Sequence, residues 1–193
     1  MPEIIYDMAE ADYRAAPCRN ASSLKDWASN PQRAKAKEDA PDKATPAMIT
    51  GRMVHQFVLE PKRFKKEHFL APDCKRNTKA GRELWEATLA ANPKRTPVME
   101  KDWVQFECMR EAALAHPKGG AYLKMKGKTE VSIFWEDEAT GQPCKGRIDK
   151  LTDRGGIIVD LKTCQDASPR AVARQENMFN YALQAAFYTD GLM

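Results

Sequence analysis

The sequence lacks the features that mark secreted, membrane-spanning and zinc-stabilised proteins. Its five cysteines are an odd number and include no Cys-x-x-Cys pair, which argues against a disulfide framework and a structural zinc site. No apolar run approaches the length of a bilayer span. The acidic N-terminus has no basic segment followed by an apolar one, so we expect a cytoplasmic protein without a signal peptide or membrane contact.

Repeats and low-complexity segments are also missing, and 193 residues fit one domain of ordinary size. The net charge of +4 is compatible with a nucleic-acid partner but does not select one. Two basic runs stand out, although each taken alone fits solvated surface. They consist of Lys62, Arg63, Lys65 and Lys66, and of Lys75, Arg76, Lys79 and Arg82.

The first two thirds of the chain predict helices. Residues 1–45 form a polar segment, whose part from residue 20 onward should mix a short helix with a loop, and 46–127 should be mainly helical. Start and stop signals place individual helices over 46–60, 78–91 and 98–116. Thr45 would cap the first of these and Pro61 would end it.

The pattern changes at Lys128, and residues 128–193 predict a β-meander followed by a helix. Three segments rich in β-branched and aromatic residues alternate with turns, and the last of them, 157–163, has the apolar start of a buried strand. From Pro169 to Gly191 the chain returns to helix, where a core stripe would consist of Phe179, Leu183 and Phe187. The fold class is therefore α/β, with a small mixed sheet flanked by helices.

The turns set the register of the meander. With 153–156 and 139–143 as hairpin turns, Asp149 lies opposite Asp160, and Glu130 lies opposite Asp149. Directly opposed side chains have Cβ atoms about 4.5–5.5 Å apart. Three carboxylates in such a row repel one another unless a cation neutralises them, and their hard oxygens suit Mg²⁺ or Mn²⁺.

Alternation along the third strand puts Lys162 on the same face as Asp160, while Leu161 points into the opposite layer. A lysine there can orient or deprotonate a water that a metal activates, or stabilise charge on a phosphate. A surface Asp-Lys ion pair is the alternative, but the strand is too apolar for a solvent-facing position.

Three blocks carry a resemblance to a known family. Gly146–Asp149 followed by Asp160–Lys162 resembles the PD-(D/E)XK (restriction-endonuclease-like) nuclease motif. Gln184–Tyr188 resembles the Gln-x-x-x-Tyr helix of its RecB-like branch, and Gly51–His55 resembles that branch's Gly-x-x-x-His helix. The likeness is strongest to phage and prophage exonucleases of the RecE type, similar to exodeoxyribonuclease VIII. Asp-x-Lys alone is a weak motif, but the three blocks in this order are strong.

The resemblance implies roles for the matched residues. The metal ligands it implies are the side chains of His55, Asp149 and Asp160 and the backbone carbonyl of Leu161. The catalytic residues it implies are Lys162, Glu130, Gln184 and Tyr188. Lys162 would be the catalytic lysine, and Glu130 would support the metal's water or Lys162. Gln184 and Tyr188, four apart on one helical face, would contact the active-site residues or a DNA phosphate, whereas Tyr181 fits a structural role equally well.

Two features of some or all of these relatives are missing from the sequence, and the second is a clear departure from the family pattern. Some RecB-branch relatives hold an iron-sulfur cluster with a late group of three cysteines; that group is absent, so we expect no cluster. RecE-type domains have a further strand after the Gln-x-x-x-Tyr helix, whereas this sequence stops at Met193. We therefore expect a single nuclease domain over 1–193 that is either a fragment or a naturally short form.

The leading hypothesis is a Mg²⁺-dependent exonuclease that acts 5′-to-3′ on double-stranded DNA ends in phage-type homologous recombination. The resemblance implies a homo-oligomeric ring, a RecT-like single-strand annealing partner, and a bacterial or phage-infected host cell. An endonuclease or a 3′-directed nuclease of the same fold is the first alternative, because the motif does not encode polarity. A non-cutting recombination accessory is the second. A structural interaction domain comes last, because it requires three ordered coincidences.

Overall fold

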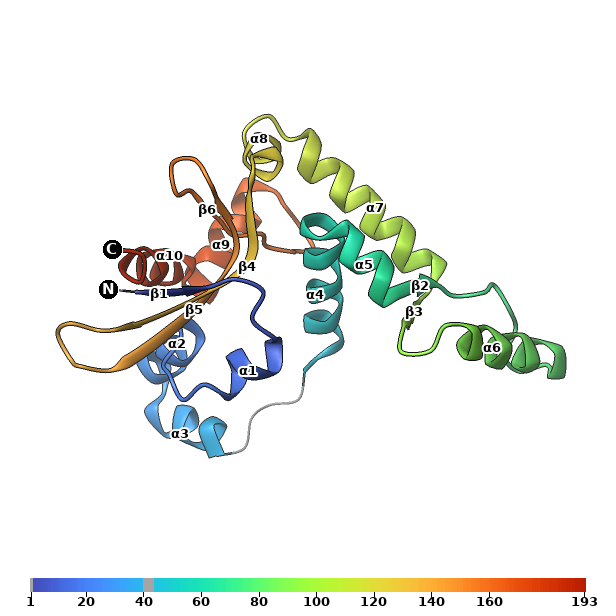
Figure 1. Ribbon diagram of the computed structural model, residues 1–193, viewed down its shortest axis with the longest axis horizontal. Coiled ribbons are helices and arrows are strands. Elements are labelled where there is room, and N and C mark those ends of the chain that lie inside the picture. Colours follow the sequence, from blue (N-terminus) through green and yellow to red (C-terminus); the bar gives the residue numbers. More distant parts are fainter. Residues whose placement is uncertain (1, 40–43) are drawn as a thin grey trace. The chain divides into compact units, whose positions relative to one another are not determined.

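The computed structural model describes residues 2–39 and 44–193 (Figure 1). Contacts divide the chain into two compact units. The sheet unit comprises residues 1–45 and 126–193, and the helical unit comprises Pro46–Met125. No helix within the described ranges is long and apolar enough to cross a membrane.

The sheet unit is an antiparallel sheet with helices, which confirms the α/β class. Its strands follow the order β1-β4-β5-β6 and are β1 (Glu3–Ile5), β4 (Gly127–Glu136), β5 (Pro143–Thr152) and β6 (Ile158–Val159). Its helices are α1 (Glu10–Ala15), α2 (Ala21–Ser29), α3 (Pro31–Asp39), α9 (Pro169–Phe179) and α10 (Tyr181–Asp190). The prediction of a mixed sheet is wrong, because all three neighbouring strand pairs are antiparallel. Short turns join β4 to β5 and β5 to β6, and strands joined in this way pair antiparallel.

The predicted register of the meander is confirmed. Thr129 pairs with Lys150 across β4 and β5, and Lys150 pairs with Val159 across β5 and β6. The predicted length of the third strand is wrong, because β6 ends at Val159. One reason is that the backbone amide of Leu161 donates to the side chain of Asp149, twelve residues earlier, instead of to a neighbouring strand.

One face of the sheet carries the core of this unit. Val131, Ile133 and Ile148 have no exposed surface, and they pack with Tyr188 from α10. A Cβ atom at Gly146 would lie 2.9 Å from Cε1 of Tyr188, which is closer than carbon atoms can approach. Glycine at this position therefore lets α10 lie directly on β5.

The opposite face of the sheet is covered by the segment that contains α1. Phe134 and Lys145 alternate with the core residues, and the ring of Tyr13 meets that of Phe134 edge to face at 6.3 Å. Lys145 is only 4% exposed, and its ammonium donates to the carbonyls of Tyr13 at 2.8 Å and Ala16 at 2.6 Å. These carbonyls lie at the C-terminal end of α1, where a cation is favourable.

Two helical predictions in this unit need correction. The segment from residue 20 contains α2 and α3 instead of one short helix, because Asn20 caps α2 by accepting from the Ser23 amide at 2.9 Å and Pro31 opens α3; residues 40–43 of the expected loop lie outside the described ranges. The helix expected over 169–191 is broken at Asn180.

Asn180 has a left-handed backbone (φ 47°), and its side chain caps α10 by accepting from the Leu183 amide at 3.3 Å. The break changes which residues share a face. Leu183 and Phe187 pack against the core, as predicted, whereas Phe179 on α9 is 49% exposed.

The helical unit confirms the three helices predicted for it. Its elements are α4 (Pro46–Leu59), α5 (Pro61–Glu67), β2 (His68–Leu70), α6 (Lys79–Ala91), β3 (Thr96–Val98), α7 (Glu100–Ala115) and α8 (Gly119–Lys124). The parallel β2–β3 pair and the short helices α5 and α8 are not predicted, because three-residue strands and two-turn helices are too short to show a period. Phe57, Phe64 and Phe106 form a buried aromatic core with Trp103 at its edge.

Candidate active site

Asp149 in β5 is the half-buried member of an acidic pair, and Asp160 is its exposed member. The β5–β6 register continues to Asp160 as the residue opposite it, one position beyond the end of β6. Oδ2 of Asp149 accepts a hydrogen bond from the Leu161 amide at 2.7 Å. Burial raises the pKa of Asp149 to about 7, and the charge of Asp160 acts in the same direction, while the Leu161 amide and Lys162 oppose it. The two carboxylates therefore lie close enough to repel each other.

Asp160 is held by two side chains. Its Oδ2 forms an ion pair with the ammonium of Lys162, and its Oδ1 accepts a hydrogen bond from Nε2 of Gln184 at 2.9 Å. The same Nε2 lies 3.3 Å from the hydroxyl oxygen of Tyr188, whose pKa is raised by burial. These four predicted site residues, from the segment after β6 and from α10, thus form one connected hydrogen-bonded group.

Lys25 on α2 belongs to the same group, although the sequence analysis did not single it out. Its Nζ lies 3.5 Å from Oε1 of Gln184, and it lies 5.7 Å from the centre of the Tyr181 ring. Nζ of Lys162 lies 5.2 Å from the centre of that ring. The pKa of Lys25 is lowered, first by burial and then by the charge of Lys162. Two ammonium groups therefore gather around one aromatic ring beside the acidic pair.

No local motif marks Lys25, because its place depends on the packing of α2 against α10. The Tyr181 ring has a clearer signal, since Tyr181, Gln184 and Tyr188 lie three and four residues apart on α10 and share a face.

Glu130 departs from the predicted row of carboxylates. The pairs on either side, Thr129 with Lys150 and Val131 with Ile148, keep the register that puts Glu130 opposite Asp149. Glu130 itself has a positive φ of 51°, so the regular alternation assumed for the row does not hold there. Its Oε2 lies 3.8 Å from Nε of Arg147. The structure thus brings Glu130 to an arginine of the same sheet face.

His55 lies on α4 of the helical unit, four residues after Gly51. Its role as a metal ligand stays a prediction. Asp149, Asp160 and Leu161, the other predicted ligands, all belong to the sheet unit.

The acidic pair suits a divalent cation in donor type and in charge. Carboxylate oxygens are hard ligands, and proteins commonly hold Mg²⁺ through one or two carboxylates together with water and substrate phosphate. Within the described part of the sheet unit, no three His, Cys, Asp or Glu side chains form a metal-binding group, so this unit offers two carboxylates rather than a complete cage. A cation between them would relieve the repulsion that helps to raise the pKa of Asp149.

Comparison with known proteins identifies the family of the chain. Residues 20–193 match the family described as a PDDEXK-like domain of unknown function (DUF3799). The match includes Lys25, both carboxylates, Lys162 and the whole of α10. No curated protein matches the chain significantly. The chain belongs to the DUF3799 family of PDDEXK-like domains.

Proposed function

We propose that this chain is a Mg²⁺-dependent deoxyribonuclease. The observation that carries the proposal is the convergence of Asp149 and Asp160 with Lys162, in a domain whose family is PDDEXK-like. The coupling of Asp160 to Gln184 and Tyr188 adds a second, independent block of the sequence to the same site. Hydrolysis of a phosphodiester needs such a set: anionic metal ligands, and a cation beside them.

Each residue has a task that its position supports. Mg²⁺, for which Mn²⁺ would substitute, would supply Lewis acidity toward the scissile phosphate and lower the pKa of water. Asp149 and Asp160 would hold it, together with the Leu161 carbonyl, and the resemblance alone implies His55 as a further ligand. Lys162, paired with Asp160, would orient the attacking water and stabilise negative charge as it develops on the phosphate.

Gln184 and Tyr188 act on the orientation of Asp160. The amide of Gln184 donates to Oδ1, which leaves the rotation of that carboxylate fixed by Lys162 on one oxygen and by Gln184 on the other. Polar groups of this kind hold metal ligands in place, and their removal lowers activity or metal affinity by about 10- to 100-fold. They are therefore positioning residues.

Lys25 extends the site toward the substrate. Its ammonium and that of Lys162 both lie against the Tyr181 ring, and the pKa of Lys25 is lowered first by burial and then by the charge of Lys162. Two cations so placed are stabilised when an anion binds between them. A phosphate of the DNA strand is the anion that this function supplies.

The finer proposal is a 5′-to-3′ exonuclease of the RecE type that acts on double-stranded DNA ends. Its support is the set of three sequence blocks and the distribution of charge. The helical unit holds 15 lysines and arginines against nine aspartates and glutamates, a formal charge of +6 within a chain whose total is +4. Such a surplus favours a polyanion. The homo-oligomeric ring and the RecT-like annealing partner rest on the resemblance alone.

The proposal is tested with linear duplex DNA labelled at the 5′ or the 3′ end and with closed circular DNA, each in Mg²⁺ and in EDTA. We expect early release of the 5′ label in Mg²⁺, an intact circle, and no reaction in EDTA. Cutting of the circle would identify an endonuclease, and early loss of the 3′ label would identify a 3′-directed enzyme. DNA binding without cleavage in Mg²⁺ or Mn²⁺ would refute a nuclease.

A further inference from the structure

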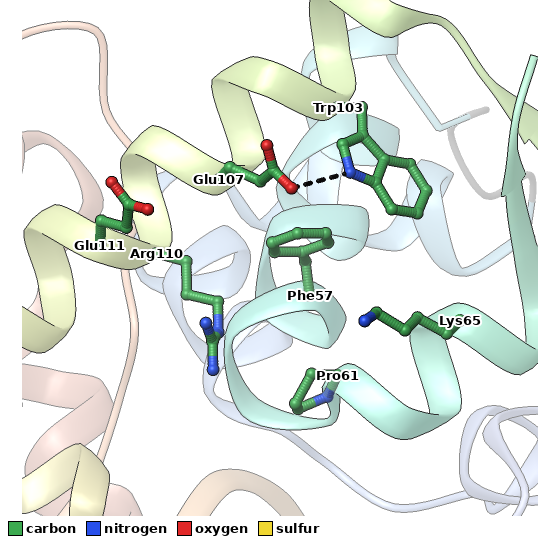
Figure 2. Close-up of a pocket in the computed structure, with 7 residues that line it drawn as sticks. All are labelled: Phe57, Pro61, Lys65, Trp103, Glu107, Arg110 and Glu111. Carbon is green, nitrogen blue, oxygen red and sulfur yellow. Dashed lines mark hydrogen bonds between the residues drawn. The ribbon is translucent and has the colours of Figure 1, made fainter.

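The helical unit contains a cavity of about 240 Å³ that belongs to neither the acidic pair nor Lys25. It lies between the end of α4, the helix α5 and the middle of α7 (Figure 2). Ligand pockets for drug-sized molecules measure roughly 300–1,000 Å³. This cavity therefore has room for a group of the size of a single nucleobase, and not for a whole nucleotide.

The apolar part of its lining is aromatic. Phe57 and Trp103 meet edge to face, with ring centres 5.7 Å apart, and Trp103 also meets Phe64 edge to face at 5.6 Å. Nε1 of Trp103 donates to Oε1 of Glu107 at 3.1 Å (Figure 2). The indole is thus held on two sides by packing and by a hydrogen bond. An aromatic ring fixed in this way offers a ready surface for a planar ligand.

The polar part of the lining carries both signs of charge. Lys65 and Arg110 reach in from α5 and α7 on either side of Phe57, and α7 also contributes Glu107 and Glu111 (Figure 2). Nε of Arg110 is buried and has no hydrogen-bond partner among the residues that the structure describes. A buried donor without an acceptor costs about 1–3 kcal/mol. Arg110 thus has donor capacity that the described residues do not use, and its side chain lines the cavity.

We propose that this cavity binds one unpaired base of a DNA strand. A base supplies the planar face for Trp103, a ring or carbonyl acceptor for Arg110, and, in cytosine or adenine, an amino donor for the carboxylate of Glu107. The inference rests on the proposed function, because DNA is the polymer that this enzyme would hold. It assigns to the helical unit a task separate from hydrolysis.

The phosphate chain that carries the base has a place beside the cavity. Lys62, Lys65 and Lys66 are exposed on α5, three and four residues apart on one helical face, and Lys65 also lines the cavity. Arg63, the other cation of this run, is engaged with Glu60 and Glu67. The three lysines form a basic ridge for the backbone on either side of the bound base.

The test is the anisotropy of a fluorescein-labelled oligo(dC) and of an abasic strand of equal length, with the full chain in EDTA so that no cleavage occurs. We expect oligo(dC) to bind more tightly, and Trp103→Leu to weaken its binding by about 5- to 150-fold, as stacking on one aromatic ring predicts. The abasic strand should bind that variant and the wild type alike. Trp85→Leu, a tryptophan on α6 outside the cavity, is the matched control and should change neither strand.

Two further variants cover the case in which Trp103→Leu fails to fold, as judged by circular dichroism. Glu107→Gln keeps the side chain's size and should reduce the preference for oligo(dC) over oligo(dT). Lys65→Ala should weaken the binding of both strands equally. Equal binding of oligo(dC) and the abasic strand by the wild type would overturn the proposal. So would equal effects of Trp103→Leu and Trp85→Leu, or competition by free dCMP as strong as by the strand. Because the binding assay contains no metal, loss of the proposed nuclease activity would leave this result standing, and the two failures are distinct.

Discussion

The side-chain amide of Gln184 donates a hydrogen bond to Oδ1 of Asp160 at 2.9 Å, and this contact joins α10 to the acidic pair. We predict that Gln184→Ala lowers kcat on linear duplex DNA by about 10- to 100-fold with little change in KM. The substitution removes the hydrogen bond that orients Asp160 and removes no contact with the DNA. Gln184→Glu should be worse, since it puts a third carboxylate beside the pair. Gln105→Ala, an exposed glutamine on α7, is the control. An unchanged kcat in Gln184→Ala would rule out a positioning role.

A second prediction concerns the pH dependence of stability in the absence of metal. In the folded chain the pKa of Asp149 is raised to about 7, whereas its ordinary value is 3.8. Between these values the unfolded chain has released this proton and the folded chain still holds it, so stability falls as pH rises, by at most about 1.4 kcal/mol per pH unit. Thermal unfolding in EDTA between about pH 4 and pH 7 measures the slope.

The matched variant for this experiment is Asp149→Asn, which removes the titrating group. The unfolding temperature of this variant should fall less steeply with rising pH than that of the wild type. Mg²⁺ added near pH 7 should stabilise the wild type more than this variant. Equal slopes of unfolding temperature against pH for the two proteins in EDTA would show that the surroundings of Asp149 do not raise its pKa.

A third prediction concerns Lys25. Lys25→Ala should raise KM for duplex DNA and reduce the dependence of binding on salt by about one counterion, because one ammonium no longer meets the phosphate. Lys126→Ala, which removes an exposed lysine of the same unit, is the control. A salt dependence identical to that of the wild type would place Lys25 outside the DNA contact and leave it a structural partner of Gln184 and Tyr181.

The strand register and the acidic pair could be predicted from the sequence because both depend on local chemistry. Two short turns determine which residues of β4, β5 and β6 face each other, and the pairs of Lys150 with Thr129 and with Val159 follow from them. The helices over 46–59, 79–91 and 100–115 likewise have nearby start and stop residues.

The features that the sequence did not predict depend on contacts between distant segments or on single backbone angles. The end of β6 at Val159 follows from a hydrogen bond between Leu161 and the side chain of Asp149, twelve residues earlier. The positive φ of Glu130 and the left-handed turn at Asn180 have no signal in the hydrophobic pattern. Lys25 joins the site because α2 packs against α10, which no local motif encodes.

The most direct test of the central claim is the hydrolysis of end-labelled linear duplex DNA in Mg²⁺ by the wild type and by Lys162→Ala. Lys162 is paired with Asp160 at the carboxylate site, so its loss should reduce the rate at least about 100-fold, while DNA binding measured in EDTA survives. Wild-type hydrolysis that stops in EDTA and disappears in the variant is the predicted result. Full activity in Lys162→Ala would contradict the proposed mechanism.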